Sequence, residues 1–122
     1  MAQILVVDDS ATVRNEVAGF LTGQGYRVAT AADGTGGLQS LRSETGIKLV
    51  ICDVNMPVMD GLTMAEKVRS ELGNQTVPII MLTTENDPKM KERGKAAGVR
   101  GWIVKPFNGS AVIGAIRKLV GE

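Results

Sequence analysis

Histidine is absent from this 122-residue chain, and cysteine occurs only once, at Cys52. The first absence removes the commonest general base and metal ligand, and any role as a phosphohistidine carrier. The single cysteine excludes an internal disulfide and a thiolate metal site, and we interpret Cys52 as a small buried apolar residue. No apolar run approaches the roughly 20 residues of a membrane span, and no signal-peptide pattern opens the chain. We therefore expect a cytoplasmic protein that does not enter a membrane.

Strong net charge is also missing, since 14 basic and 13 acidic side chains leave a formal charge of +1. Such a balance gives no general attraction for nucleic acid or for a membrane surface. The charges are unevenly distributed: residues 1–85 carry 6 basic and 10 acidic side chains, whereas residues 86–122 carry 8 and 3. The length matches a single domain, with a core of useful size and a basic final third.

Short apolar runs alternate with helical patterns along the whole chain. Strands are expected at 4–7, 27–31, 49–52, 78–82 and 101–104. The first helix should follow Ser10, a suitable N-cap, because apolar residues recur there at helical spacing. Later helices are expected after Asp33 and at about 62–72, 88–97 and 112–120. Five β-α units without a linker or repeat predict one α/β domain with a parallel sheet covered on both faces.

Polar residues follow these apolar runs where the predicted strands end. They are Asp8, Asp9, Asp53, Thr83 and Lys105. Because parallel strands bring their carboxyl ends to one edge of a sheet, where ligands bind, we expect these side chains to meet in one site. Taken one by one, each has a simpler explanation as a helix cap, an exposed lysine or a satisfied hydroxyl. Their joint occurrence favours a functional site.

The chemistry of this set indicates a divalent cation and a phosphoryl group. Three neighbouring carboxylates repel one another, and Mg²⁺, which prefers oxygen ligands, relieves that repulsion. The ammonium of Lys105 and the hydroxyl of Thr83 suit the charge that spreads over a transferring phosphoryl group. A carboxylate can itself act as nucleophile and form an acyl phosphate.

The same residues resemble the signature of the response regulator receiver domain. The matching elements are Asp8-Asp9, the segment 53–61 that begins with Asp53 and ends in Asp-Gly, Thr83-Thr84-Glu85, and Lys105-Pro106-Phe107. The resemblance covers essentially the whole chain, and the single-domain chemotaxis regulators of this family are the most similar. It implies the flavodoxin-like (βα)5 fold with strand order 2-1-3-4-5. We expect residues 1–122 to be one receiver domain without an output domain.

The resemblance also assigns roles at the site. Asp53 matches the phosphorylated aspartate, Lys105 the lysine that pairs with the phosphoryl group, and Thr83 the hydroxyl that moves to bond it. Asp9 and Asp53 match direct Mg²⁺ ligands, and Asp8 matches a ligand that acts through water.

Three further positions follow from the same resemblance. The backbone carbonyl of Asn55 matches the remaining protein ligand of Mg²⁺. The side chains of Asn55 and Glu85 match positions that tune autodephosphorylation, and Pro106 matches a cis-proline. The expected partners are a histidine kinase and an output protein, with the flagellar motor switch as one candidate. The chain itself is expected to be a monomer and not an enzyme.

The fourth helix and the basic final third are the expected output region. The inward stripe of that helix, Met90, Gly94 and Ala97, is poor in apolar area, and Gly94 costs about 1 kcal/mol relative to alanine. We predict that it is the least stable and most mobile element. The family uses the fourth helix, fifth strand and fifth helix as its output face. A basic patch there suits an acidic partner, and its members would be Lys89, Lys91, Arg93, Lys95, Arg100, Arg117 and Lys118.

The chain departs from the chemotaxis regulators at Trp102, where they carry a tyrosine that swings inward when the threonine moves. Tryptophan is larger and has only an N–H donor, so it repacks less easily. The branched Thr84 beside Thr83 could restrict the space into which the ring turns. The usual coupling between threonine and aromatic ring is therefore an open question in this chain.

Other functions share parts of this pattern. A phosphotransfer shuttle or a phosphate sink would use the same site without a change in partner affinity. An aspartyl-phosphate hydrolase often uses Asp-x-Asp, but Asn55 occupies the second position and cannot protonate a leaving group. A flavin-binding module of the same fold needs a phosphate loop after the first strand, where Asp8 and Asp9 would repel phosphate.

Overall fold

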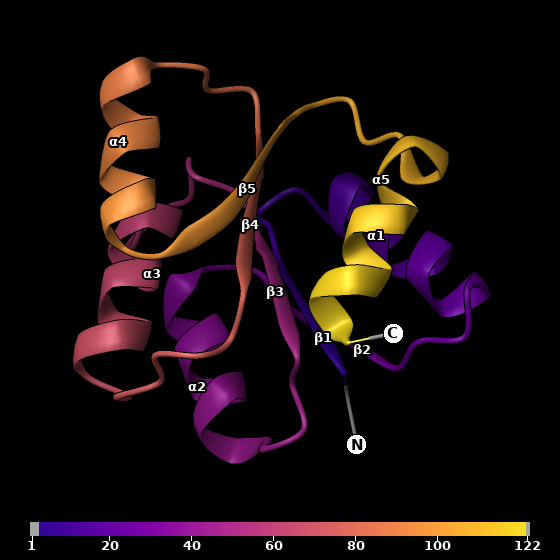
Figure 1. The fold of residues 1–122 in the computed structure, drawn as a ribbon, viewed down its shortest axis with the longest axis horizontal. Coiled ribbons are helices and arrows are strands. Elements are labelled where there is room, and N and C mark those ends of the chain that lie inside the picture. Colours follow the sequence, from indigo (N-terminus) through magenta and orange to yellow (C-terminus); the bar gives the residue numbers. More distant parts are fainter. Residues whose placement is uncertain (1–2, 122) are drawn as a thin grey trace.

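Five short parallel strands form the centre of the molecule (Figure 1), and the computed structural model describes residues 3–121. The strands are β1 (Ile4–Val7), β2 (Val28–Ala31), β3 (Leu49–Cys52), β4 (Ile79–Thr83) and β5 (Val99–Val104). Their order in the sheet is β2-β1-β3-β4-β5. The predicted flavodoxin-like architecture and its strand order are confirmed.

Each strand is followed by a helix. The helices are α1 (Ala11–Gly23), α2 (Gly34–Ser43), α3 (Gly61–Ser70), α4 (Pro88–Ala96) and α5 (Gly109–Val120). The first four begin after side chains that accept a backbone N–H of the first turn, and these caps are Ser10, Asp33, Asp60 and Asp87. Short polar side chains are favoured at this position because helix N-termini leave backbone donors unpaired.

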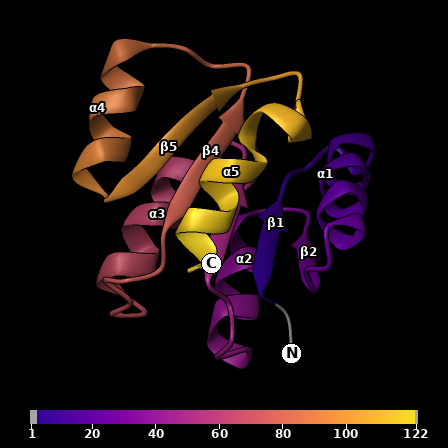
Figure 2. The ribbon, with the colours of Figure 1, turned by 45° about the vertical axis from the view of Figure 1, so that its right-hand side comes forward.

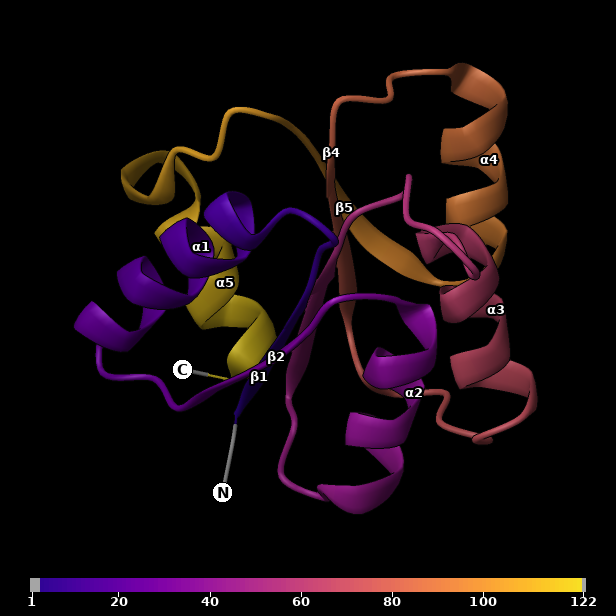
Figure 3. The same ribbon diagram turned by 180° about the vertical axis from the view of Figure 1, so that it is seen from behind.

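The helices cover both faces of the sheet, with α1 and α5 on one side and α2, α3 and α4 on the other (Figures 1 and 3). Successive strand residues point to opposite faces, so Leu5 and Val7 join one core cluster while Ile4 and Val6 join the other. The central strands β1, β3 and β4 are buried along their whole length. This burial on both faces explains why they are continuous apolar runs.

Four strand boundaries differ from the sequence prediction, and of these the starts of β2 and β4 lie one residue later than expected. β4 extends to Thr83, which pairs with Val104 of β5, so the threonine is the last residue of the strand. β5 begins at Val99, two residues earlier than expected, and a register irregularity near Ile79 and Ile80 accommodates the added length. Periodicity alone could not find this start, because edge strand β5 is only partly buried and carries Arg100 and Gly101.

Helix α4 has the small apolar stripe that the sequence predicted. Gly94 and Ala97 are buried, and Met90 is partly buried against the core. Its mobility stays a prediction. Instead of broad apolar contact, α4 has polar links to α3, which lies beside it (Figure 3). The guanidinium of Arg93 donates to Glu66 at 2.7 and 2.9 Å.

No helix within residues 3–121 has both the length and the apolar character needed to cross a membrane.

Candidate functional site

The register of the sheet brings the predicted site residues to one edge. Val7 of β1 pairs with Cys52 of β3, so the next residues, Asp8 and Asp53, leave the sheet side by side. Thr83 pairs with Val104, and Lys105 follows directly. The site therefore forms where the carboxyl ends of β1, β3, β4 and β5 meet (Figure 2).

The three carboxylates converge as the sequence predicted. One carboxylate oxygen from each of Asp8, Asp9 and Asp53 lies within 4.8 Å of the other two. Asp8 and Asp53 are buried, whereas Asp9 is exposed at the rim. This set of hard, anionic oxygens with an open side suits Mg²⁺, which takes a few carboxylates and completes its coordination with water and phosphate oxygens.

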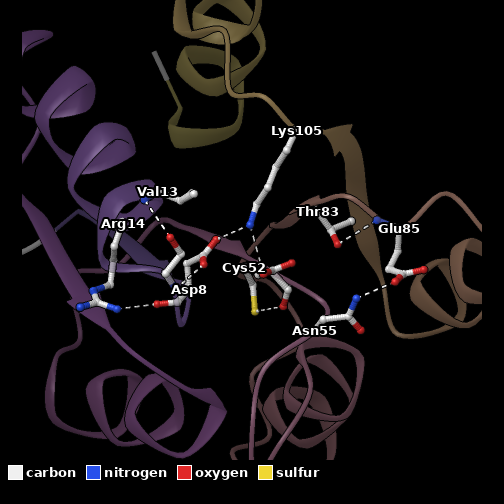
Figure 4. Close-up of polar contacts among 10 residues, drawn as sticks. Asp8, Val13, Arg14, Cys52, Asn55, Thr83, Glu85 and Lys105 are labelled. Carbon is white, nitrogen blue, oxygen red and sulfur yellow. Dashed lines mark hydrogen bonds and ion pairs between the residues drawn. The ribbon is translucent and has the colours of Figure 1, made fainter.

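Lys105 compensates part of this negative charge. Its Nζ lies 3.0 Å from Asp8 Oδ2 and 3.2 Å from Asp53 Oδ2, and Figure 4 shows the side chain reaching down into the site. Burial works to lower the pKa of Lys105, but its hydrogen bonds to the two carboxylates outweigh this and raise the pKa above 10.5. The amine is thus held protonated, as a partner for an anionic group must be. The Lys105–Pro106 peptide bond is cis, as the family resemblance implies.

Asp8 is held from several sides. Burial raises the pKa of its carboxyl, and the charge of Asp53 acts in the same direction, while the Ser10 N–H and Lys105 oppose them. The Ser10 N–H donates to Asp8 Oδ1 at 2.9 Å. The guanidinium of Arg14 donates to the Asp8 carbonyl oxygen at 2.7 Å. These contacts fix the short loop between β1 and α1.

Asp53 is backed by the start of α3. A Cβ at Gly61 would overlap the Asp53 carbonyl oxygen, so only glycine permits this close approach. The Gly61 N–H donates to Val54 O at 2.8 Å. The short path from Asp53 to Gly61 keeps the predicted phosphoacceptor against a rigid helix end. Asn55 lies in this loop, and its carbonyl stays the predicted fourth protein ligand.

Glu85 joins three parts of the site. Its backbone N–H donates to Thr83 Oγ1 at 3.2 Å, and its carboxylate accepts a 2.6 Å hydrogen bond from the Asn55 amide (Figure 4). Its backbone carbonyl accepts a 2.8 Å hydrogen bond from the indole N–H of Trp102. The Thr83 hydroxyl, the Asn55 amide and the Trp102 indole are thus linked through Glu85.

Three of the predicted output residues are lysines on helices α4 and α5. Lys89 and Lys91 are exposed on α4 and Lys118 on α5, and these helices cover opposite faces of the sheet with edge strand β5 between them. Two of the basic residues expected in the patch contact neighbouring parts of the fold. Arg93 binds Glu66 on α3, and Arg117 donates to Gln24 and lies over the Tyr26 ring. Their place in the patch stays a prediction, because Arg93 remains exposed while it makes this contact.

Two functional contacts escaped the sequence analysis. Arg14 supports the Asp8 backbone, and its signal was a positive charge in the early turns of a helix, where the dipole disfavours it. The second is the Trp102–Glu85 hydrogen bond, which joins residues 17 positions apart in the chain. No local pattern indicates a side chain bonding to a distant backbone carbonyl.

Comparisons with known proteins agree with this geometry. The family model of the response regulator receiver domain matches residues 4–117. The chain is 41% identical over 106 residues to chemotaxis protein CheY1 of Helicobacter pylori, covering 86% of each chain. It is 41% identical to a CheY homolog of Campylobacter jejuni, covering 86% of this chain and 82% of that protein.

Solved structures show the same likeness. Chemotaxis protein CheY4 of Vibrio cholerae superposes with a TM-score of 0.89 at 42% identity, covering 98% of both chains. TrrA of Thermotoga maritima, solved in complex with Mg²⁺-BeF, superposes with a TM-score of 0.85 at 31% identity, covering 98% of this chain and 99% of that one. From the family match, the level of identity and the arrangement of the strand ends, this chain belongs to the response regulator receiver domain family.

Proposed function

We propose that this chain accepts a phosphoryl group on Asp53 from the phosphohistidine of a partner kinase, in a Mg²⁺-dependent step. The observation that carries the proposal is the convergence of three carboxylates with the Lys105 ammonium at one sheet edge. An Asp53 carboxylate oxygen attacks phosphorus and forms the acyl phosphate. The phosphorus–nitrogen bond breaks, and its electron pair stays on the imidazole of the kinase.

The surrounding residues have separate tasks in this step. Asp8, Asp9, Asp53 and the Asn55 carbonyl would hold Mg²⁺, which, when bound, neutralises charge on the phosphoryl oxygens. Lys105 Nζ supplies a second positive charge beside Asp53. The Thr83 hydroxyl is available to donate toward the phosphoryl group, since the Glu85 N–H uses it only as an acceptor.

Hydrolysis then resets the site. Water attacks phosphorus, the acyl phosphate bond breaks, and inorganic phosphate leaves while Asp53 regains its carboxylate. Asn55 and Glu85, which are bonded to each other beside the site, are the residues that set access for this water. Chemistry on its own aspartate makes the chain a signalling protein rather than an enzyme acting on other substrates.

Output is proposed to be phosphorylation-dependent protein binding by a monomer in the cytoplasm, in chemotaxis or flagellar motor control. Its support is the identity to proteins named as chemotaxis regulators. The exposed side chains of Lys89, Lys91 and Lys118 favour a partner with an acidic segment, because complementary charge speeds encounter. Replacing all three with glutamate should weaken partner binding and leave phosphorylation intact. Unchanged affinity at low salt would contradict this role.

A second candidate is a phosphate sink or shuttle, and the position of Trp102 favours it. The indole N–H donates to the Glu85 carbonyl oxygen at 2.8 Å, a hydrogen bond that must break before the ring can move. A ring that stays there transmits little on phosphorylation. An aspartyl-phosphate hydrolase is less favoured, because Asn55 donates to Glu85 and has no proton for a leaving group. The hydrolase hypothesis requires multiple turnover on a phosphomonoester, and we expect no such turnover.

The deciding experiment is Trp102 fluorescence during titration with Mg²⁺ and then beryllium fluoride, in the wild type and in Asp53→Asn. The chain has one tryptophan, so the signal has one source. A Mg²⁺-dependent change on beryllium fluoride addition that Asp53→Asn abolishes would support phosphoacceptance coupled to Trp102. Binding of beryllium fluoride that is detected by NMR but causes no change in Trp102 fluorescence would favour the phosphate sink. Absence of both Mg²⁺ and beryllium fluoride binding would overturn the proposal.

A further inference from the structure

Arg14 lies at an unfavourable position in its own helix, and its side chain makes its contact outside that helix. It is the fourth residue of α1, close to an N-terminus whose partial charge is positive and disfavours a cation. Its side chain turns back toward the loop, and Nη1 donates to the Asp8 carbonyl oxygen at 2.7 Å (Figure 4). This contact connects α1 to the backbone that carries the two adjacent acids.

The oxygen that Arg14 binds belongs to the peptide unit between Asp8 and Asp9. That unit is planar, so holding its oxygen also fixes the direction in which the chain enters Asp9. The Asp8 carboxylate is held separately, by the Ser10 N–H and by Lys105. The Asp9 carboxylate, by contrast, is exposed and has no hydrogen bond or ion pair to any residue within 3–121. The direction in which the Asp9 carboxylate points therefore depends on the backbone.

We propose that Arg14 is a positioning residue that presents Asp9 for Mg²⁺ and thereby favours Mg²⁺ over larger cations. Mg²⁺ demands near-ideal octahedral geometry at short distances, whereas Ca²⁺ accepts longer and more variable ones. A loop that is free to rotate about the Asp8–Asp9 peptide unit therefore loses more affinity for Mg²⁺ than for Ca²⁺. This inference rests on the metal site of the proposed function.

The guanidinium has a second effect of opposite sign, which makes the proposal testable. Its positive charge lies behind the acidic loop and repels a cation. If charge were its main contribution, removing Arg14 would tighten Mg²⁺ binding. If positioning is its main contribution, removal weakens binding despite the relief of repulsion.

The test is titration of ¹⁵N-labelled protein with Mg²⁺ and with Ca²⁺, followed by the amide signals of the β1–α1 and β3–α3 loops. The variants are Arg14→Met and Arg14→Lys, which keeps the charge but loses the planar fork. The matched control is Arg27→Met, which removes an exposed arginine that precedes β2 at the opposite edge of the sheet.

Arg14→Met should raise the Kd for Mg²⁺ roughly three- to tenfold, below the range for partners that touch a ligand side chain directly. Its Kd for Ca²⁺ should change by less than about twofold, because the Ca²⁺ shell adapts to a displaced ligand. Arg14→Lys should lie between wild type and Arg14→Met, and Arg27→Met should match the wild type.

Tighter or unchanged Mg²⁺ binding in Arg14→Met would overturn the proposal, and so would an equal loss for both cations. If Arg14→Met does not fold, an unaltered Mg²⁺ to Ca²⁺ preference in Arg14→Lys overturns it instead. A wild type that binds no Mg²⁺ would refute the metal site of the proposed function, a result distinct from failure of the Arg14 role.

Discussion

Replacing Arg69 with methionine should destabilise the domain far more than its surface position suggests. The guanidinium makes four hydrogen bonds to backbone carbonyls and, among residues 3–121, none to a carboxylate. Nε donates to Ala97 O at 2.9 Å and Nη2 to Gly98 O at 3.2 Å, at the end of α4. Nη1 donates to Asn74 O at 3.1 Å and Val77 O at 2.8 Å, in the loop before β4. One side chain of α3 thus holds two other segments.

The magnitude follows from these contacts. Partial burial, together with the nearby charge of Arg100, lowers the pKa of Arg69, so the charge is partly desolvated and its hydrogen bonds must compensate. Three of the four bonds are partly buried. At about 1 kcal/mol net for each of these, their loss amounts to about 3 kcal/mol, a large part of the roughly 5–15 kcal/mol that such domains possess. Methionine retains the apolar stem, so little packing is lost.

Urea unfolding measures this directly. With a slope of roughly 1.5 kcal/mol per molar, the midpoint of Arg69→Met should fall by about 2 M. Lys67→Met on the same helix is the control, because Lys67 makes only an exposed ion pair with Glu71 and should shift the midpoint much less. Hydrogen exchange should also accelerate in α4, which loses the hold on its last turn. Equal midpoints for the two variants would refute the assignment of Arg69 as the link between α3 and α4.

Three other perturbations test the remaining structure. Hydrogen bonds from Arg93 lower the pKa of Glu66 below 4.5 in the folded protein. This pair therefore stabilises the fold above pH 4.5 and loses its effect as the pH falls through the folded pKa of Glu66. The difference in unfolding free energy between wild type and Glu66→Gln should shrink over the same pH range. Burial raises the pKa of the Cys52 thiol, so iodoacetamide at pH 8 should label Cys52 in urea but not in the native protein. Gly61→Ala forces a Cβ against the Asp53 carbonyl and should cost about 2 kcal/mol by urea unfolding.

The fold and the candidate site were largely predictable because their signals are local. Each central strand is an apolar run buried on both faces, and each site residue stands where such a run ends. Parallel topology then makes neighbours of strand ends that are far apart in sequence, so the pattern predicts the observed contacts of Lys105 with Asp8 and Asp53. The strand order came from the family resemblance, since periodicity does not specify which strands pair.

Side-chain direction was not predictable in the same way. Arg93 and Arg117 are basic residues near the expected output face, yet one turns toward α3 and the other toward α1. Arg69 binds four carbonyls from two segments that only the folded chain brings together. Composition records a charge, whereas its partner depends on tertiary packing. A charge count therefore predicts where basic residues gather but not which of them already have a partner within the fold.

Gly94 and Trp102, two anomalies when considered along the sequence, explain each other in the structure. A Cβ added at Gly94 would lie 3.3 Å from the Trp102 ring and 3.4 Å from Leu62. A glycine that weakens α4 by about 1 kcal/mol therefore also makes room for the indole. The indole in turn bonds to the Glu85 carbonyl at the start of the α4 segment. The helix thus carries a glycine at the position where it contacts the ring, so we expect any change in the position of Trp102 to alter the packing of α4.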